Sequence, residues 1–314
     1  MLLKTECITP NSGHYRYNRG YTLIELLASS ALGIIILGAT FSSAITGKKI
    51  LNREFKTTKL TQNLRSAIDL VGIEIRLAGE QLPANLPAVE LINGVGNEPD
   101  QLILRRNLLS EVLTVCTNLN SGQSNSQVIF ATGDGTVDTG ITSSACVFSD
   151  PGQVTNLNAW RNFRITQGGA TQAYIYDLVA KHGEFFPYHT EGSTADIFFI
   201  GRSSGVWSRN YPYISSSLYL LEEHRYRLVD GSLEFIRNTN WSSPSRIISS
   251  LTNFQVLINF TDGTTATELP ASGSRLWTDI KNIEVTIEGE EKTGANMIKK
   301  RISSSFYPRN ILSN

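Results

Sequence analysis

The stretch Arg19-Gly20-Tyr21-Thr22-Leu23-Ile24-Glu25-Leu26-Leu27 places one carboxylate inside an apolar run. Glu25 is the only charged residue among the 27 residues from position 21 to position 47. A run of about 20 apolar residues is long enough to cross a bilayer as a helix. A carboxylate inside such a helix costs about 2.5 kcal/mol or more, so an unpaired one indicates a functional site. The stretch therefore predicts a membrane-spanning helix whose single charge has a role.

An α-amino group is the obvious partner for Glu25. A cut after Gly20 would create such a group at Tyr21, in the same apolar layer as the carboxylate. Within one helix the two groups lie about one turn apart, and the amine of a neighbouring subunit could also reach the carboxylate. The negative charge in the first turn also complements the positive end of the helix dipole. Glu25 is therefore a candidate for pairing between subunits.

These residues resemble the class III signal of type IV prepilins and type II secretion pseudopilins, in which Gly is followed by an aromatic residue and by Glu at the fifth position. The resemblance implies that residues 1–20 are a leader, which a prepilin peptidase removes by cutting between Gly20 and Tyr21 on the cytoplasmic side. It also implies N-methylation of Tyr21, although Tyr departs from the more common Phe. Subunit assembly is then assigned to the start of the mature helix, at Thr22, Leu23, Ile24 and Glu25.

Two simpler interpretations of the apolar run stay open. A secretory signal has an apolar core of about 7–15 residues before a small-residue cleavage site. The run here is longer, and Ser43-Ala44 or Thr46-Gly47 would have to serve as that site. An ordinary single-pass anchor fits the length, but it leaves Glu25 unexplained. The pilin-like interpretation is the one that gives the carboxylate a partner.

Charge predicts the orientation and excludes one class of partner. The leader contains Lys4, Arg16 and Arg19 against Glu6, so the positive-inside rule places residues 1–20 in the cytoplasm. The body then lies on the periplasmic side of the inner membrane. The chain has 28 basic and 28 acidic residues, and removing the leader leaves 28 − 3 = 25 against 28 − 1 = 27, a net charge of −2. This balance lacks the basic footprint of nucleic-acid-binding proteins, so no direct binding to nucleic acid is predicted.

The three cysteines predict a disulfide in the body. Cys7 lies in the leader, which leaves Cys116 and Cys146 as the pair in the mature chain. A disulfide is plausible outside the cytoplasm and would stabilise the fold by about 2–4 kcal/mol. Two buried free thiols or a zinc site are alternatives, and neither a CxxC motif nor a histidine pair accompanies the cysteines to favour zinc.

Apolar periodicity predicts that the helix continues well beyond the membrane span. One face is formed by residues three or four positions apart, namely Leu60, Leu64, Ile68, Val71, Ile75 and Ala78. A single helix over about 21–78 is therefore expected, apolar all round over 21–47 and amphipathic after that. It would be roughly 87 Å long, with Gly79 as its stop signal. We assign residues 21–80 to this helix and its end, and residues 81–314 to a globular head.

The sequence of the head consists of short strand-like runs separated by the turn residues Gly, Ser, Asn and Asp. Together with the long helix, this pattern predicts an α+β fold with a β-rich head. A hairpin over residues 225–235 is expected around Asp230-Gly231. A connector near 149–162 would divide the head into two β-rich portions, and a helix near 270–281 stays open. The expected strands are 101–106, 111–116, 127–131, 173–180, 195–201, 219–229, 232–237, 253–260, 282–288 and 297–306.

Three head segments are similar to PilW-type minor pilins of type IV pili, relatives of the J-type pseudopilins of type II secretion. They are residues 74–79, the hairpin at 225–237 and the ending 306–310. The resemblance implies a minor subunit that joins other minor pilins and the major pilin in a priming complex at the pilus tip. A mature length of 294 residues favours the pilus protein over the pseudopilin. The alternatives are a type II secretion pseudopilin, or a tip-displayed adhesin that uses loops near 185–189 and 207–213.

Three sequence patterns could indicate a hydrolase or a metal site, and each has a simpler interpretation. Residues 201–205 match the Gly-x-Ser-x-Gly pattern of a nucleophile elbow, which needs a following helix, an acid and a histidine. Residues 206–212 are poor helix sequence, so a Ser/Gly loop is preferred. His182 and His189 are taken as solvated loop residues rather than metal ligands, and residues 133–138 as a turn rather than a calcium loop. The prediction is a structural subunit that is not an enzyme and has no cofactor or metal.

Overall fold

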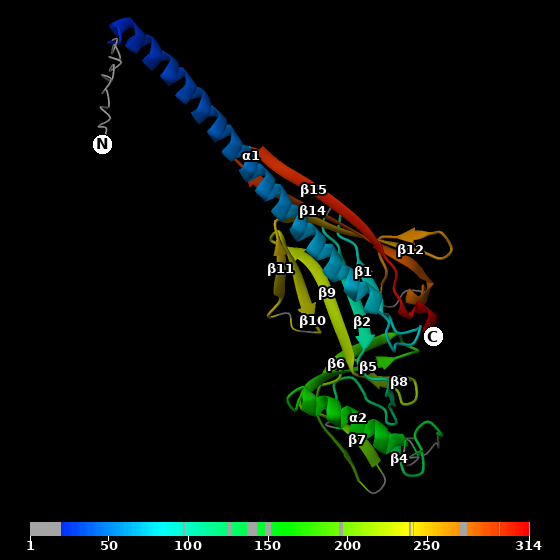
Figure 1. The fold of residues 1–314 in the computed structure, drawn as a ribbon. Coiled ribbons are helices and arrows are strands. Elements are labelled where there is room, and N and C mark those ends of the chain that lie inside the picture. The colour runs from blue at the N-terminus through cyan, green and yellow to red at the C-terminus, as the bar shows by residue number, and fades with distance from the viewer. Residues whose placement is uncertain are drawn as a thin grey trace, which may run out of the picture. The chain divides into compact units, whose positions relative to one another are not determined.

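The computed structural model describes residues 20–96, 98–124, 127–136, 143–147, 152–194, 197–238, 240, 242–270, 275–294 and 296–313. It has an α+β fold in which a long N-terminal helix is followed by a β-rich head (Figure 1). The chain divides into two compact units, Met1–Phe55 and Lys56–Asn314. The helix α1, Leu23–Leu77, contributes residues to both units. The expected fold class is confirmed.

The second half of α1 has the amphipathic face that the sequence predicts. The residues expected on that face, Leu60, Leu64, Ile68, Val71, Ile75 and Ala78, are all buried, together with Ala67. Their burial against the head stabilises this part of the helix, because amphipathic helices gain most of their stability from packing of the apolar face. The first half, up to Phe55, is treated below as a candidate site.

Gly79 ends the helix as expected. Its φ of +82° lies in the left-handed region, which glycine adopts without steric cost. A Cβ atom at Gly79 would lie 2.1 Å from the ring of Trp277, so a larger residue would also clash. The Gly79 N–H donates to the carbonyl oxygen of Arg105 at 2.9 Å, which ties the end of the helix to the head.

The described residues of the head form three antiparallel sheets. The first sheet has the order β1-β2-β9-β10-β11, the second β13-β12-β14-β15 and the third β3-β8-β5-β6-β7-β4. The first sheet consists of β1 (Val89–Ile92), β2 (Gln101–Asn107), β9 (Leu221–Val229), β10 (Ser232–Arg237) and β11 (Ser245–Ser249). The second consists of β12 (Leu251–Phe260), β13 (Thr265–Ala266), β14 (Ile280–Thr293) and β15 (Asn296–Phe306). The third consists of β3 (Leu113–Thr114), β4 (Gln127–Thr132), β5 (Thr171–Asp177), β6 (His182–Ser193), β7 (Ile197–Arg202) and β8 (Ser216–Tyr219).

Two hydrophobic cores organise the head. One core joins the buried face of α1 to the first and second sheets, and includes Tyr226, Phe254 and Ile283. The other lies within the third sheet and the helix α2 (Gly152–Thr166), and includes Trp160, Phe186 and Trp207. The chain enters the third sheet after β2 and returns at β9, so the strands from β3 to β8 form one continuous insertion.

The expected hairpin is present. β9 and β10 pair antiparallel, with Val229 opposite Ser232. The two turn residues have positive φ values, +49° at Asp230 and +69° at Gly231, as a tight two-residue hairpin turn requires. Each of the ten expected strands overlaps a strand of the structure. The strands β1, β6, β11 and β13 were not expected. Of β8, the expected run 219–229 includes only the last residue, Tyr219.

The expected connector near 149–162 is wrong where the structure describes it, because residues from 152 onward lie in α2. Asn and Thr in this stretch have low intrinsic helix propensity, which hides the helix from sequence inspection. Packing stabilises it instead: Leu157 and Trp160 lie in the second core. Among the described residues of the stretch 270–281, where a helix was left open, the structure has a short 3₁₀ turn, Trp277–Asp279.

Candidate functional site

The start of α1 contains a reciprocal pair of hydrogen bonds between Thr22 and Glu25. The backbone N–H of Thr22 donates to Oε2 of Glu25 at 2.9 Å, and the Thr22 hydroxyl donates to the same oxygen at 3.0 Å. In return, the backbone N–H of Glu25 donates to Oγ1 of Thr22 at 3.3 Å. This is a capping box, in which the residue before the helix and the third helical residue satisfy each other's free N–H groups. Thr22 thus gives Glu25 a partner within its own chain, which sequence inspection did not identify.

The first half of α1 is uncovered within the described chain. Tyr21, Leu23 and Ile24 are 88%, 80% and 74% exposed, and the large apolar residues as far as Phe55 are exposed on every side of the helix. Its length and composition are sufficient to cross a membrane. A continuous apolar surface of this kind needs lipid or other apolar helices to cover it and shield it from water.

Four side-chain hydroxyl groups in this half form hydrogen bonds to the helix backbone. The hydroxyl groups of Ser29, Ser30, Thr40 and Thr46 donate to backbone carbonyl oxygens three or four positions earlier, at 2.8–3.1 Å. Bonds of this kind remove the cost of placing a hydroxyl group in an apolar environment. These four hydroxyl groups therefore present no unsatisfied donor to a surrounding apolar phase.

Gly20 and Tyr21 precede the helix and are exposed. The expected cut between them lies two residues before Leu23, where α1 begins. Residues 1–19, including Cys7 and the basic residues of the leader, lie outside the described residues. The capping box uses atoms of Thr22 and Glu25 alone, so a cut after Gly20 leaves the helix start intact.

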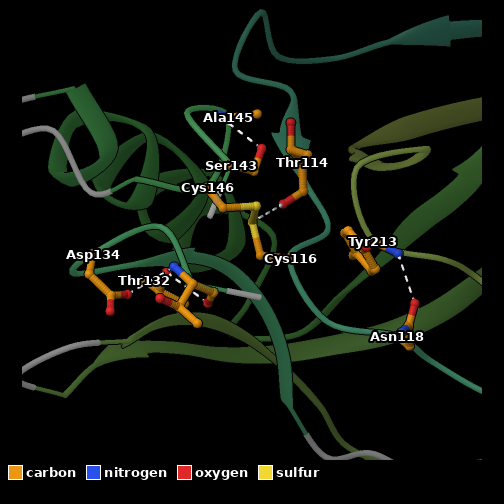
Figure 2. Close-up of a disulfide and its surroundings, with 10 residues drawn as sticks. Thr114, Cys116, Asn118, Thr132, Asp134, Ser143, Ala145, Cys146 and Tyr213 are labelled. Carbon is orange, nitrogen blue, oxygen red and sulfur yellow. Dashed lines mark hydrogen bonds between the residues drawn. A yellow bond between two sulfur atoms is a disulfide. The ribbon is translucent and has the colours of Figure 1, made fainter. Parts of the chain in front are cut away.

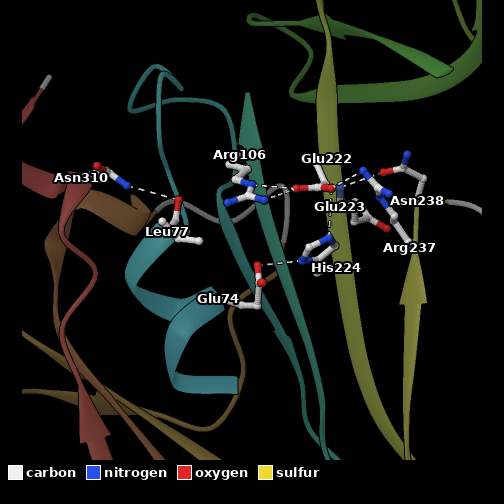
Figure 3. A network of polar contacts seen from close by, with 9 residues as sticks. All are labelled: Glu74, Leu77, Arg106, Glu222, Glu223, His224, Arg237, Asn238 and Asn310. Atoms are coloured by element: carbon white, nitrogen blue, oxygen red, sulfur yellow. Dashed lines mark hydrogen bonds and ion pairs between the residues drawn. The ribbon is translucent and has the colours of Figure 1, made fainter. Parts of the chain in front are cut away.

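A cluster of charged side chains joins the second half of α1 to the first sheet (Figure 3). Nδ1 of His224 lies 2.7 Å from Oε2 of Glu74, and Nε2 of His224 lies 3.3 Å from Oε1 of Glu222. Arg106 and Arg237 approach Glu222 to 2.5 Å and 2.6 Å. Because every buried charge here has a counter-charge, the cluster avoids the cost of an isolated charge in the head.

The charges of this cluster shift one another's pKa values. Burial alone would lower the pKa of His224, but the hydrogen bonds to Glu222 and Glu74 outweigh it and raise the pKa above its ordinary value. The hydrogen bond from His224, followed by the contact with Arg106, lowers the pKa of Glu222 to about 2. The hydrogen bonds to the two carboxylates therefore favour the charged form of the histidine over its neutral form.

A second buried group lies beside this cluster on the first sheet. Arg105 of β2 is 7% exposed, and its guanidinium lies 2.7 Å from both Glu90 of β1 and Glu223 of β9. Its Nη1 also donates to the carbonyl oxygen of Pro87 at 3.0 Å. Burial alone would lower the pKa of Arg105, and the carboxylates of Glu223 and Glu90 reverse that effect and raise it. Arg105 thus ties three strands together in the charged state.

Sequence inspection did not single out these charged groups as a site. A local signal exists in the alternation along β9, where His224 and Glu222 fall on the same face. Their contacts with Glu74 and Arg106 depend on the packing of α1 and β2, which no local pattern specifies.

The helix α2 is held to the third sheet by one carboxylate. Glu191 of β6 accepts hydrogen bonds from Arg161 and Arg164 at 2.8–2.9 Å and from the hydroxyl of Tyr188 at 2.5 Å. Burial raises the pKa of Glu191, but these donors, Arg164 first, outweigh it and lower the pKa to about 2. These tertiary contacts between charged groups stabilise α2, whose intrinsic helix propensity is weak.

Cys116 and Cys146 form the expected disulfide (Figure 2), with a Cα–Cα distance of 5.8 Å. Both residues are fully buried and pack against Ile129 and Tyr213. The Cys116 N–H donates to the carbonyl oxygen of Ile129, and the Cys146 carbonyl oxygen accepts from the N–H of Thr132. The bond therefore joins the segment after β3 to the segment that follows β4.

Four aromatic residues of the loops that were expected as contact surfaces lie in the core. Phe186, Tyr188, Trp207 and Tyr211 are all fully buried. Residues 185–189 lie in β6, where alternate side chains face the second core. The expectation of solvated aromatic loops is wrong at these four residues. At 185–189, Pro187 and nearby charges obscured the alternation of a strand.

The nucleophile-elbow pattern lacks its structural context. Ser203 follows β7, and no helix occurs in residues 203–215, all of which the structure describes. Its N–H donates to the carbonyl oxygen of Pro187 at 3.1 Å. The neighbouring Arg202 is buried, with its guanidinium 4.1 Å from the ring centroid of Trp207. This segment is the loop that the sequence favoured.

Among the described residues, no group of three or more His, Cys, Asp or Glu side chains could hold a metal ion. His182 and His189 both lie in β6 rather than in a loop, and His189 is exposed. Asp134 accepts a hydrogen bond from the N–H of Thr136 at 2.8 Å, as in a turn. Residues 137–142, which include Asp138, lie outside the described residues.

Comparison with known proteins gives one structural neighbour. No family model matches the chain, and no curated protein sequence matches it. The solved structure of the type IV-like pilin TTHA1219 from Thermus thermophilus aligns with a TM-score of 0.35 and 8% sequence identity, covering 80% of this chain and 96% of that chain. A similarity of this size does not assign the chain to that family.

Proposed function

We propose that the chain is a type IV pilin-like subunit, and more specifically a PilW-type minor pilin. In this proposal a prepilin peptidase cuts between Gly20 and Tyr21 and the new amine of Tyr21 is methylated. The mature subunit first resides in the inner membrane with its head on the periplasmic side. It then joins other minor pilins and the major pilin in a priming complex at the pilus tip.

The observation that carries the proposal is the uncovered apolar half of α1, directly after the expected cut. Its exposed residues need lipid before assembly and the helices of other subunits afterwards, which is what a filament subunit requires. The amphipathic second half, by contrast, is buried in the head. One helix thus combines an anchoring half with a half that belongs to the core of the head.

Glu25 fits a role between subunits in addition to its role in the capping box. Oε2 accepts both hydrogen bonds from Thr22, while Oε1 accepts none from the described part of the chain. A carboxylate can accept about four hydrogen bonds, so Glu25 retains capacity for an amine. A neighbouring subunit's Tyr21 amine would supply the positive charge that the apolar layer otherwise lacks.

The disulfide supports the proposed compartment. Disulfides persist mainly in oxidising environments such as the periplasm and the cell surface, and are rare in the cytoplasm. Cys116 and Cys146 lie in the head, which the proposal places outside the inner membrane. The orientation and the cysteine chemistry therefore agree.

The experiment that tests the proposal is mass spectrometry of the mature N-terminus, on protein from its native membrane with and without prepilin peptidase. We expect an N-methylated Tyr21 that is absent when the peptidase is absent. An intact Met1, or a cut near Ala44, would exclude a pilin. Finding the processed protein in sheared surface pili would then separate a pilus subunit from a type II secretion pseudopilin, which shares the cut.

A further inference from the structure

A cavity of about 590 Å³ lies where the third sheet and α2 meet the first sheet. Cavities of about 300–1,000 Å³ are typical of small-ligand sites in proteins. Its lining combines an apolar floor, which includes Leu221 and Pro187, with six residues that determine its chemistry: Phe163, Gln167, Gln172, Arg237, Asn238 and Asn240. Neither the proposed processing nor the proposed assembly uses this cavity.

The hydrogen-bonding groups of the cavity are mainly amides, and some are already fixed. The backbone N–H of Asn238 donates to the Glu223 carbonyl oxygen at 2.7 Å, and Asn238 Oδ1 accepts from the Glu223 N–H at 2.9 Å. Asn240 Oδ1 accepts from the hydroxyl of Ser242 at 3.2 Å. Each of these oxygens already accepts one hydrogen bond, and the side-chain NH2 groups of both asparagines remain as donors. Their positions are set before any ligand binds.

Two further amides are free to bond in either direction. The side chains of Gln167 and Gln172 make no hydrogen bond to other described residues, and each offers one acceptor and two donors. Gln172 is half-buried on β5, while Gln167 follows α2 directly. The ring of Phe163 supplies an apolar surface beside them. The cavity thus suits a ligand that has many hydroxyl groups and also an apolar face.

The electrostatics of the cavity disfavour anions. Arg237 is the single charged residue among the described lining residues, and its Nη2 already lies 2.6 Å from Glu222 (Figure 3). Phe163 and Gln167 lie at the C-terminal end of α2, where the helix dipole is negative. A phosphate or sulfate group would therefore meet a neutralised guanidinium and an unfavourable dipole.

The sheet topology disfavours an extended peptide. The strands that line the cavity are β5, β6, β9 and β10, and each is paired on both of its edges. Short runs beside the cavity do lack a second partner, namely residues 171–173 of β5 and 236–237 of β10. An added strand would gain few main-chain hydrogen bonds from runs this short, and such bonds are how sheets usually capture extended peptides. We infer that the cavity binds a neutral saccharide, through the amides of Gln167, Gln172, Asn238 and Asn240 and the ring of Phe163.

The test uses the full-length protein in a detergent without a sugar headgroup, applied to a printed array of neutral, sialylated and sulfated oligosaccharides. We expect binding to neutral oligosaccharides. A net hydrogen bond contributes about 0.5–1.5 kcal/mol, so Gln167→Leu and Gln172→Leu should each weaken the affinity about two- to tenfold. Gln127→Leu, at an exposed position on β4, is the matched control and should leave the affinity unchanged.

A second variant separates loss of the site from loss of the fold. Ala170→Trp would fill the cavity from an exposed position of its lining while keeping all four amides, and it should abolish binding with unchanged thermal unfolding. Three results would each overturn the inference: no neutral oligosaccharide bound, binding confined to sialylated or sulfated oligosaccharides, or binding that all three cavity variants retain.

Discussion

Nδ1 of His224 on β9 lies 2.7 Å from Oε2 of Glu74 on α1, across 150 positions of sequence. The contact joins the long helix to the first sheet through the imidazole of His224. Glu222 completes the arrangement on the other side of the imidazole, at 3.3 Å. The strength of this connection therefore depends on whether His224 is protonated.

The stability of the head should fall as the pH rises through the pKa of His224 in the folded protein. That pKa is raised, so the stabilisation is fully present below the ordinary histidine value of 6.5 and is lost at higher pH. We expect His224→Gln to lower the free energy of unfolding at pH 6 by about 1.5–3 kcal/mol, the usual contribution of hydrogen bonds to charged groups. The measurement is urea unfolding followed by tryptophan fluorescence.

The same difference should shrink at pH 9, because a larger share of the wild-type histidine is then neutral. His189→Gln, at an exposed position on β6, is the matched control and should show no such pH dependence. A His224→Gln variant whose loss of stability is equal at both pH values would show that the histidine acts through packing alone, for example against Phe235, whose ring centroid is 4.7 Å away.

Variants of Thr22 and Glu25 should separate helix capping from charge pairing. Glu25→Gln keeps a residue that can serve in a capping box but removes the charge, whereas Thr22→Ala removes the cap and keeps the charge. If Glu25 pairs with a neighbouring amine, Glu25→Gln and Glu25→Val should be membrane-inserted and processed but poorly incorporated into filaments. Thr22→Ala, which costs about 1 kcal/mol of helix stability, should be incorporated nearly normally. Immunoblots of membranes and sheared pili measure both steps.

Normal incorporation of Glu25→Gln would contradict a charge role for this residue. A defect in Thr22→Ala as large as that in Glu25→Val would instead show that the capping box is the feature that assembly needs. The two side chains touch each other, so their effects should be compared in the double variant as well.

Removing the disulfide should destabilise the head by about 2–4 kcal/mol. The double variant Cys116→Ser/Cys146→Ser should unfold at a lower urea concentration than the oxidised wild type. Reductant should lower the wild-type midpoint towards that of the variant and leave the variant itself unchanged. Equal midpoints for the wild type with and without reductant would show that the bond, although formed, does not stabilise the head.

Gly72 should not tolerate alanine. A Cβ atom there would lie 2.2 Å from Cε1 of Phe306, which is 5% exposed. Gly72→Ala should therefore destabilise the head by about 1–3 kcal/mol through overpacking, although alanine favours a helix by about 1 kcal/mol. In a Phe306→Leu background the same substitution should cost much less, because the ring edge is gone. An equal cost in both backgrounds, measured by urea unfolding, would rule out this contact as the cause.

The features that the sequence predicted well are those with a local signal. The steps of four and three among Leu64, Ile68 and Val71 indicate a helix wherever it lies in the fold, and α1 ends within a residue of the expected position. Asp230-Gly231 reports a hairpin because few other residue pairs accept positive φ at both positions. The strands β12, β14 and β15 of the second sheet were likewise expected from the sequence.

Elements stabilised from outside were missed. The helix α2 has weak intrinsic propensity and is held by Trp160 in the second core and by the contacts of Arg161 and Arg164 with Glu191. β6 contains Pro187 and several charges, yet it is paired on both sides within the third sheet. Neither stabilising environment is encoded within the segment itself.

The sequence by itself determined the long helix, its apolar first half, the isolated Glu25 and the cysteine pair, because periodicity, charge and composition act over neighbouring residues. Only the tertiary structure decided that Glu74 meets His224, that Thr22 and Glu25 adopt a reciprocal cap, and that α2, β5 and β10 enclose one cavity. The distant contacts follow from the order of strands and the packing of α1. That order is set by the total burial of apolar surface over the whole head, which no single stretch of sequence displays.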